Sequence, residues 1–482
     1  MNLTILRTIH ILSPLVITVI GCKGPNASDL GKTPQSLPNV VIIYTDDQAQ
    51  EDIGIYTTRE SLTPAIDEIA ENGVRFQQFY TASPVCTPSR VALMTGKTPV
   101  RAGFNRNAPK NGRGLPLSNK TMANFFKDQG YTTALIGKWH LGENPEYHPN
   151  SRGFDYFYGH LSGVVDNSTH QFRWNQPHHH DLWENRRDLA KDEAHMAKHQ
   201  NGDEEHLAIS LMNKAQQFIA NAQKPFFLYY AINQPHYPIQ PLEGTIPAKG
   251  AGDTVAEQEA DRHYQGFVKT IDHMVMSLRS DLEVMGKLDN TIMIFQSDHG
   301  HSAESRNWEG ISHQNLQSNT LFRQNHPYRF RGTKFSHFEG GIRVPAIISW
   351  PSGLIPKNEV RNQMAVNTDW LPTLAALINK PLPSYYCEGD CLSLMPIIES
   401  DTPTREHYFW HHYSQGWALR EGTWKLLKKV IDPYVPVAEE FFLVNLVGDP
   451  KERSNLFYTP EHHQKSEAMR LKGEALHSGL SP

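Results

Sequence analysis

The chain is poor in cysteine, has no excess of positive charge and lacks a long apolar run at its start. Its 482 residues include 4 cysteines, and its formal net charge is −5 at pH 7. General nucleic-acid binders are normally basic, so no nucleic-acid partner is expected. The N-terminal apolar run, from Ile9 to Ile20, is too short to cross a bilayer as a helix. No internal repeat is found.

The overall composition is that of an ordinary globular protein. Hydrophobic residues make up 39% of the chain and charged residues 20%. A chain of this length is too long for one small core, so a large domain accompanied by a smaller one is expected.

The N-terminal residues are typical of an export signal. Arg7 precedes the apolar run, which ends in Val19-Ile-Gly-Cys22. This ending resembles a bacterial lipoprotein box, which implies that residues 1–22 are a signal peptide and that Cys22 carries a lipid. The protein is then expected at the bacterial cell envelope, anchored to a membrane in the periplasm or at the outer-membrane surface; a plain secretory signal is the alternative. Residues 23–37, rich in Gly, Pro, Ser and Asn, are predicted to be a flexible tether.

Two further cysteines lie close together near the C-terminal end of the chain. Cys387 and Cys391 could close a small disulfide loop in an oxidising compartment. Two reduced thiols are the alternative, because side-chain geometry decides whether the bond forms.

Apolar runs typical of strands buried on both faces alternate with amphipathic helical stretches. This order predicts an α/β fold with a large, mostly parallel but mixed sheet sandwiched by helices. The main domain is expected over residues 38–383, and a smaller C-terminal α+β subdomain with a short antiparallel sheet over 384–482. The predicted strands are 39–45, 131–136, 226–232, 291–295, 346–350, 417–427 and 440–444, and the predicted helices are 63–73, 88–96, 118–130, 205–223, 255–286 and one at the C-terminus.

Four of the predicted strands end in residues that can bind metal or move protons. In an open α/β sheet, ligands bind outside the carboxyl ends of parallel strands, so these residues should meet at one edge. Polar residues ending strands at the surface would explain one such cluster but not four. The clusters are Asp46-Asp47, Lys138 with His140, His236, and Asp298-His299.

Cys86 is the residue around which these clusters are expected to gather. Pro88 suits the first position of a helix and Gly96 suits its end, so Cys86 should lie just before a helix N-terminus. Arg90 lies one turn along the same face. Free N–H groups and an arginine favour a nucleophile or an anion site at the cysteine. A small buried cysteine beside a structural arginine is the alternative.

Five motifs resemble the sulfatase family of formylglycine-dependent, type I enzymes in the alkaline-phosphatase-like superfamily. The resemblance covers residues 39–456 and implies hydrolysis of sulfate monoesters. The motifs are Cys86-Thr-Pro-Ser-Arg90, Lys138-Trp-His-Leu-Gly142, Ser297-Asp-His-Gly300, Glu339-Gly-Gly-Ile-Arg-Val-Pro345 and Asp449-Pro-Lys-Glu-Arg-Ser-Asn455.

The resemblance also implies a modified residue and a metal. Cys86 would be oxidised to formylglycine by a formylglycine-generating maturation enzyme. One divalent cation would be bound by that residue together with Asp46, Asp47, Asp298 and His299. A carboxylate-rich site suits calcium. Position 299 is often Asn in the family. The imidazole of His299 is a softer ligand than an amide oxygen, so the identity of the metal is less defined.

The same resemblance implies that the remaining residues stabilise negative charge and transfer protons. Lys138 and Lys334 would neutralise the sulfuryl oxygens, while Arg90 would orient residue 86. His236 would protonate the departing alcohol oxygen, and His140 would take a proton from the second hydroxyl of hydrated formylglycine.

The substrate is less defined by the sequence. A lipoprotein with a long polar segment after Gly300 suggests sulfated polysaccharide or oligosaccharide fragments as substrate. The residues that could line substrate subsites are His160, Asp166, His170, Trp174 and Trp308, each of which could equally be ordinary packing or surface. His178-His179-His180 could bind metal, but three adjacent side chains cannot face one ion, which favours a loop.

Two rival functions remain open. One is a phosphodiesterase or phosphonate monoester hydrolase of the same superfamily. The other is a non-catalytic surface lipoprotein that binds sulfated glycans, which would need a missing site residue or an unmodified cysteine.

Overall fold

The computed structural model of the chain describes residues 36–57, 60–109, 112–172, 179–248, 256–302, 330–411, 416–429 and 440–479, with the side chains of 256–261 left aside. Residues 37–482 form one compact unit, to which the following description applies. The predicted signal peptide with Cys22, and nearly all of the tether, lie outside the described residues. Among the described helices, none is both long and apolar enough to span a membrane.

A mixed ten-stranded sheet forms the centre of the unit, as predicted. Its middle strands are parallel, with Ile42 opposite Tyr229 on one side and Ile294 on the other. In sheet order the strands are β13 (Glu359–Arg361), β2 (Gly73–Phe76), β12 (Ala346–Ser349), β11 (Thr291–Ser297), β1 (Asn39–Thr45), β10 (Phe226–Ala231), β4 (Thr132–Lys138), β5 (Tyr156–His160), β8 (Trp183–Glu184) and β9 (Arg187–Asp188).

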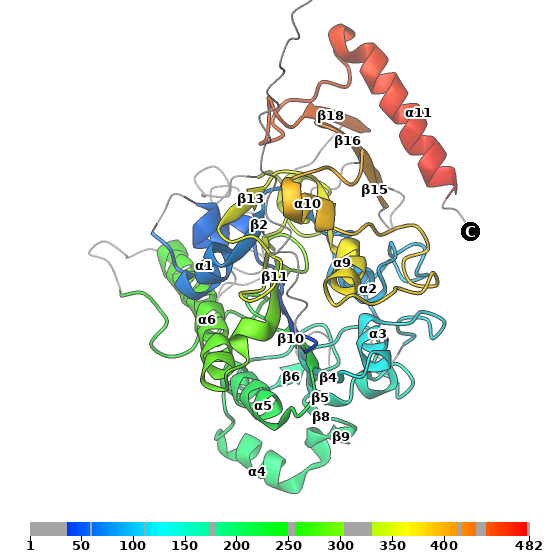
Figure 1. The fold of residues 1–482 in the computed structure, drawn as a ribbon. Coiled ribbons are helices and arrows are strands. Elements are labelled where there is room, and N and C mark those ends of the chain that lie inside the picture. Colours follow the sequence, from blue (N-terminus) through cyan, green and yellow to red (C-terminus); the bar gives the residue numbers. More distant parts are fainter. Residues whose placement is uncertain are drawn as a thin grey trace, which may run out of the picture. The chain divides into compact units, whose positions relative to one another are not determined.

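Helices cover both faces of this sheet because its strands are apolar on both faces (Figure 1). Side chains of β1 alternate, so that Val40 and Ile42 join one core and Val41 and Ile43 join the other. The first core is closed by α2 (Cys86–Thr95), α3 (Met122–Asp128), α9 (Trp370–Leu377) and α10 (Met395–Ser400), and the second by α1 (Pro64–Glu71), α5 (Leu207–Asn221) and α6 (Ala256–Val284).

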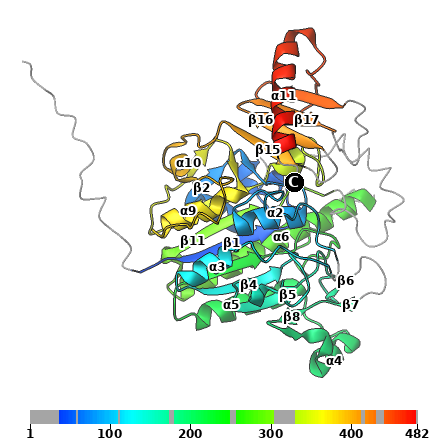
Figure 2. The same ribbon diagram turned by 90° about the vertical axis from the view of Figure 1, so that its right-hand side faces the viewer.

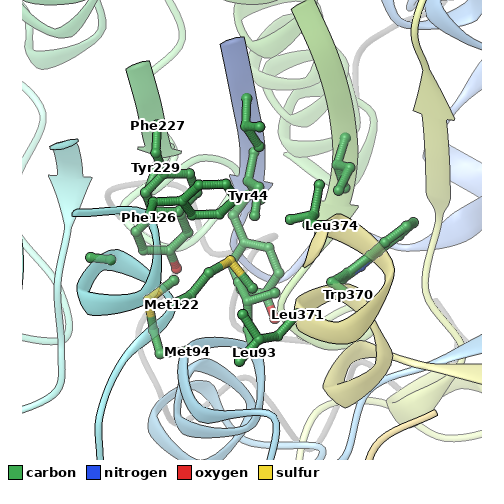
Figure 3. Packing of buried hydrophobic residues seen from close by; sticks show 14 of the residues in the cluster. Tyr44, Leu93, Met94, Met122, Phe126, Phe227, Tyr229, Trp370, Leu371 and Leu374 are labelled. Atoms are coloured by element: carbon green, nitrogen blue, oxygen red, sulfur yellow. The ribbon is translucent and has the colours of Figure 1, made fainter. Parts of the chain in front are cut away.

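The first core lies directly beneath the strand ends. Figure 3 shows Tyr44 and Tyr229, from neighbouring strands, beside Phe126 of α3 and above Leu93 of α2. The Phe126 ring stacks on Phe227 at 4.5 Å between centroids. The Tyr44 hydroxyl lies 2.9 Å from Ser89 Oγ, so α2 is tied to the end of β1 as well as packed against it.

The C-terminal part forms a four-stranded antiparallel sheet with one long helix, as expected. The strands are β15 (His407–His411), β16 (Trp417–Glu421), β17 (Trp424–Lys428) and β18 (Phe441–Asn445), and the helix is α11 (His463–Gly479). Figure 2 shows α11 lying across this sheet. Gly473 faces the Trp417 ring so closely that a larger residue could not fit there. The other side of the sheet shares a core with Tyr80 and Phe338, so the two parts of the unit are packed together.

Lys425, on β17, lies fully buried between two glutamates from distant parts of the chain. Its Nζ is 2.8 Å from Glu339 Oε1 and 2.9 Å from Glu452 Oε1. Glu339 begins the short helix α8 (Glu339–Ile342), and its N–H donates to Glu452 Oε2 at 2.6 Å. Burial raises the pKa of Glu452 to about 7, since Lys425 only partly compensates and Glu339 adds repulsion. The motifs that begin at Glu339 and Asp449 therefore both contact the buried ammonium group of Lys425.

Several boundaries differ from the sequence predictions. Helix α2 begins at Cys86 and not at Pro88, which occupies the third position, where its missing N–H still costs nothing. Helix α3 begins only at Met122, where Thr121 caps it. The predicted strand 417–427 is a hairpin that turns at Gly422. Cys387 and Cys391 form a disulfide, which settles that alternative.

The remaining strands are short. β3 (Phe79–Tyr80) pairs with β14 (Ala365–Val366), and β6 (Gln171–Phe172) pairs with β7 (His179–His180). The small helix α4 (Glu193–Asn201) follows β9.

Candidate active site

The four polar clusters meet because the strands that precede them are parallel neighbours. Backbone hydrogen bonds fix the loops that leave these strands. The Asp298 N–H donates to Thr45 O at 2.9 Å, and the Asp46 N–H donates to Gln234 O at 3.2 Å. Lys138 is the last residue of β4, next to β10. One sheet edge therefore presents acids, a lysine and the loop that carries His236.

Three carboxylates and one imidazole converge at the centre of this edge. His299 Nε2 lies 3.3 Å from Asp47 Oδ1, 3.4 Å from Asp298 Oδ1 and 4.0 Å from Asp46 Oδ1. All four side chains are fully buried. Buried carboxylates crowded this closely need a compensating positive charge. Their oxygens, with one nitrogen, match the donor set of a divalent cation site.

The orientation of His299 suits a metal ligand. Its Nδ1 lies 2.9 Å from Gly300 O and donates to it, which leaves the Nε2 lone pair facing the carboxylates. Burial would lower the pKa of His299, but Asp298, Cys86 and Asp47 outweigh it and raise the pKa to about 9. The acids thus attract positive charge to Nε2, which a bound cation would supply in place of a proton.

Two cationic side chains from other elements also contact these carboxylates. Arg90 Nη2 lies 3.2 Å from Asp46 Oδ2 and 3.0 Å from Asp298 Oδ2. Lys138 Nζ contacts Asp46 Oδ2 directly. Burial alone would raise the pKa of Asp46, but Lys138, His236 and Arg90 hold it well below its usual range. Asp46 is therefore a carboxylate, although no water reaches it.

Cys86 opens α2 with its side chain directed at this cluster. Its Sγ lies 3.2 Å from His299 Nε2 and 3.8 Å from Asp46 Oδ1. Ser89, one turn on, donates its hydroxyl to Asp298 O and so fixes the helix against the end of β11. Every residue from Cys86 to Thr95 is buried. The cysteine is thus held rigidly among the acids.

Lys334 and His236 both lie close to the carboxylate of Asp47. Lys334 Nζ is 2.9 Å from Asp47 Oδ1, and His236 Nε2 is 3.7 Å from Asp47 Oδ2. The next residue, Phe335, donates its N–H to Pro84 O at 2.9 Å, which joins the lysine loop to the cysteine loop. Burial, followed by Lys334, lowers the pKa of His236 to about 4.

His140 lies near the cysteine in a left-handed backbone conformation, with φ of 56°. Thr87, in the first turn of α2, donates its hydroxyl to His140 O at 3.0 Å. Burial, with Lys138 and Arg90, holds the pKa of His140 well below its usual range, so the imidazole is neutral and able to accept a proton. Gly163 packs against the ring, where any Cβ would collide with it.

The residues proposed to contact substrate are distributed differently. His160 is fully buried beside Lys138 in the β4–β5 pairing, and its Nδ1 lies 3.0 Å from Ser162 O. Asp166 accepts backbone N–H groups from Ser168 and Thr169 and so shapes a turn. His170 faces a separate group of histidines. Trp174 and Trp308 lie outside the described residues.

That separate group was missed by the sequence reasoning. It brings His170 and His180 together with His195 and Glu204. The loop interpretation of the three adjacent histidines is wrong for His179 and His180, which form β7. A usable signal was present in His195 and His199, which are spaced to share one face of a helix. Tyr229, whose hydroxyl lies 3.2 Å from Arg90 Nη1, was also missed because it belongs to an apolar run.

Comparison of this chain with known proteins identifies its family. A family model described as Sulfatase matches residues 38–380. The chain belongs to the sulfatase family. A second model, described as N-sulphoglucosamine sulphohydrolase, C-terminal, matches residues 329–478 of this sulfatase. It is accordingly a sulfuric ester hydrolase, and family members use formylglycine and a divalent metal.

Individual relatives cover most of the chain. Human arylsulfatase A is 32% identical over 403 residues, which span 80% of this chain and 74% of that protein. Dog N-acetylgalactosamine-6-sulfatase is 32% identical over 407 residues, covering 80% of this chain and 71% of that protein. Among solved structures, the crystal structure of Ps i-CgsB matches with a TM-score of 0.75 and 26% identity, over 92% of this chain and 93% of that one.

Proposed function

We propose that this sulfatase hydrolyses sulfate monoesters of carbohydrates through a formylglycine made from Cys86. The observation that carries the proposal is the position of Cys86 Sγ, 3.2 Å from His299 Nε2 within a buried group of three carboxylates, an arginine and two lysines. A packing cysteine has no need of such surroundings, whereas a nucleophile for an anionic ester does.

Cys86 Sγ stands where the oxygens of the modified side chain would lie. Hydrated formylglycine supplies two hydroxyls on one carbon, one to attack sulfur and one to expel the sulfate afterwards. Oxidation would be carried out by a maturation enzyme that provides the oxidant, which is the one protein partner we propose.

Calcium is the proposed metal. Asp46, Asp47, Asp298 and His299 would hold it together with residue 86, and oxygen atoms predominate among these donors. The cation would polarise a sulfuryl oxygen and the attacking hydroxyl as a Lewis acid. A single imidazole among the donors is compatible with calcium but also admits softer divalent metals.

Side chains of the protein would stabilise charge and transfer protons during the reaction. Lys138 and Lys334, both buried, would neutralise the sulfuryl oxygens as charge develops. His236 would give a proton to the departing alcohol oxygen. Its pKa of about 4 requires the anionic substrate to raise it, which a nearby negative charge does. His140, held neutral, would take the proton from the second hydroxyl and so release sulfate.

A sulfated carbohydrate is the proposed substrate class. Two similarities support it. One solved relative, 25% identical with a TM-score of 0.73, is Ps i-CgsB in complex with k-i-k-neocarrahexaose. Several curated relatives are N-acetylgalactosamine-6-sulfatases, whose name specifies a sulfated amino sugar. Nearly all of the long polar segment after Gly300 lies outside the described residues.

Sulfate release across a panel of sulfated oligosaccharides tests the proposal. The expected result is turnover of at least one sulfated sugar, with formylglycine at residue 86 found by mass spectrometry of the active enzyme. Phosphodiesters and phosphonate monoesters belong in the same panel, and faster turnover of these would favour the rival hydrolase function. Binding of sulfated glycans without any sulfate release would favour the non-catalytic one.

We propose a lipid-anchored location at the cell envelope. The Cys387–Cys391 disulfide supports export to an oxidising compartment. Incorporation of labelled fatty acid at Cys22, lost in Cys22→Ala, tests the anchor. A protein that never incorporates the label would be a secreted or otherwise unanchored one.

A further inference from the structure

Four side chains that play no part in the catalytic centre converge on one point beside β6 and β7. His170 precedes β6, His180 ends β7, His195 lies on α4 and Glu204 follows that helix. The side chains of His170, His180 and Glu204 are 2–4% exposed, and that of His195 is 20% exposed. None of them is shared with the acid cluster around Cys86.

Their donor atoms lie as close together as the ligands of a single metal ion, all within 4.8 Å of one another. Glu204 Oε1 lies 3.3 Å from His170 Nδ1, 3.0 Å from His180 Nε2 and 3.3 Å from His195 Nε2. The two Nε2 atoms are 3.1 Å apart. Zinc–nitrogen and zinc–oxygen bonds of about 2.0–2.1 Å at tetrahedral angles place neighbouring ligands about 3.3 Å apart.

Hydrogen bonding alone does not satisfy this group. His180 Nε2 lies within hydrogen-bonding distance of both Glu204 Oε1 and His195 Nε2, and one N–H cannot serve both. Neither ring nitrogen of His170 makes a hydrogen bond of good geometry among the described residues, although the ring is buried and Nδ1 lies 3.3 Å from Glu204 Oε1. Buried polar groups are rarely left in this state. A cation at the centre would accept the lone pairs of all three imidazoles.

A further histidine orients the carboxylate as a metal site requires. His199 Nδ1 donates to Glu204 Oε2, the oxygen that faces away from the other three histidines. His199 Nε2 in turn lies 3.0 Å from Gln171 Nε2 and accepts from it, which places the proton on Nδ1. Partners of this kind hold metal ligands in place in known sites.

We infer that His170, His180, His195 and Glu204 bind a zinc ion that is separate from the catalytic cation. Imidazole donors favour zinc and its d-block neighbours over calcium, which prefers oxygen. Four protein ligands leave no open position, so this is a structural site and not a second catalytic one.

The ion would hold the β6–β7 pair and α4 against the loops of the catalytic edge. Asp181, next to His180, accepts the Ser162 N–H at 2.8 Å, and the adjacent Gly163 packs on the His140 ring. Asp166, four residues before His170, accepts from Gln240 Nε2 at 3.0 Å in the segment that follows His236. The zinc would therefore fix a layer that contacts the His140 ring and the segment following His236.

Metal analysis of full-length protein without a histidine tag tests the site. After incubation with equimolar zinc in calcium buffer and removal of free metal, wild type should retain one zinc per chain. His195→Ala should lose it, and its partly exposed position makes a folding failure improbable. His180→Ala and Glu204→Gln should lose it as well. His179→Ala is the matched control, since it lies on the same strand but packs on Phe172, and should keep the zinc.

Thermal unfolding separates the two metals. Zinc should raise the melting temperature of wild type and His179→Ala but not of His195→Ala, whereas calcium should raise it in all three. Cobalt bound in place of zinc should give the intense visible absorption of a tetrahedral ion. Wild type that retains no zinc, or His195→Ala and His180→Ala that retain as much as wild type, would overturn the assignment.

Discussion

His299 Nε2 lies 3.2 Å from Cys86 Sγ, so the proposed nucleophile and one proposed metal ligand are in direct contact. The same nitrogen is 3.3 Å from Asp47 Oδ1. An atom bound to residue 86 in place of sulfur would thus lie within reach of the cation. The contact explains why metal binding and nucleophile activation should fail together.

His299→Ala should weaken cation retention by at least about 10-fold, because it removes a ligand and leaves three carboxylates crowded together. His299→Asn restores an oxygen donor and should recover calcium binding and turnover. Bound metal measured after dialysis, together with sulfate release before and after chelation, checks both variants. Undiminished turnover by fully metal-free wild type would contradict the role of the cation.

Cys86→Ser should allow at most one slow turnover. Serine offers a single hydroxyl beside Lys138 and the acids, so attack on sulfur and loss of the alcohol remain open to it. The sulfated serine then has no second hydroxyl from which His140 could take a proton. The expected result is a burst of one alcohol per enzyme, and a peptide at residue 86 heavier by one SO₃.

The mature enzyme provides the comparison for this variant. His140→Ala should slow sulfate release more than alcohol release, because it leaves the attacking hydroxyl in place. Sustained turnover by Cys86→Ser without trapped sulfate would mean that hydrolysis of a simple serine ester suffices.

His236→Ala should affect substrates according to their leaving groups. A general acid contributes about 10²–10⁴-fold, and chiefly when the departing oxygen is strongly basic. Turnover of a sugar sulfate should therefore fall by about 100-fold or more, and that of 4-nitrophenyl sulfate by much less. Lys334→Ala, which removes charge from the sulfuryl oxygens, should slow both substrates alike. Equal losses for both substrates in His236→Ala would exclude it as the acid.

Glu452 makes the stability of the unit depend on pH. Its pKa is about 7 when folded, above the ordinary value of 4.5, so the folded state binds the extra proton. The resulting stability is complete below about pH 4.5 and is lost as pH rises towards 7, by up to about 3 kcal/mol. Glu452→Gln should remove this decline. Urea unfolding at pH 5 and pH 7.5, in constant calcium, measures it.

Glu440→Gln is the control, because Glu440 is exposed and lies immediately before β18. It should leave the pH dependence unchanged. A wild-type decline that persists in Glu452→Gln would assign it to another group.

The meeting of the polar clusters at one sheet edge could be predicted, because each cluster follows a strand that is recognisable from its local sequence pattern. Apolar runs identify parallel strands, and Asp46, Lys138 and Asp298 each stand at the end of one. The start of α2 was misplaced by two residues, since proline is tolerated throughout the first turn and marks no single position.

The histidine group could not be predicted in the same way. Its members come from one very short strand, a polar helix and two loop positions, and nothing in the sequence states that His170 and His195 meet. Lys425 is a similar case, because its two glutamates lie at positions 339 and 452 and only tertiary packing selects them. Pairings between distant polar residues depend on the fold as a whole.

The buried link from Lys425 to Glu339 and Glu452 has a consequence for the order of events during synthesis. The backbone carbonyl of Glu452 also accepts a hydrogen bond from Arg331 Nη1 at 2.8 Å. Glu452 thus binds both Arg331 and Glu339, the two ends of the segment that carries Lys334. This segment is secured only after the ribosome has made nearly the whole chain. Until then it lacks its two contacts with Glu452, although the Phe335 N–H can already donate to Pro84 O. We therefore expect the proposed oxidation of Cys86 to be easiest before the C-terminal sheet is complete.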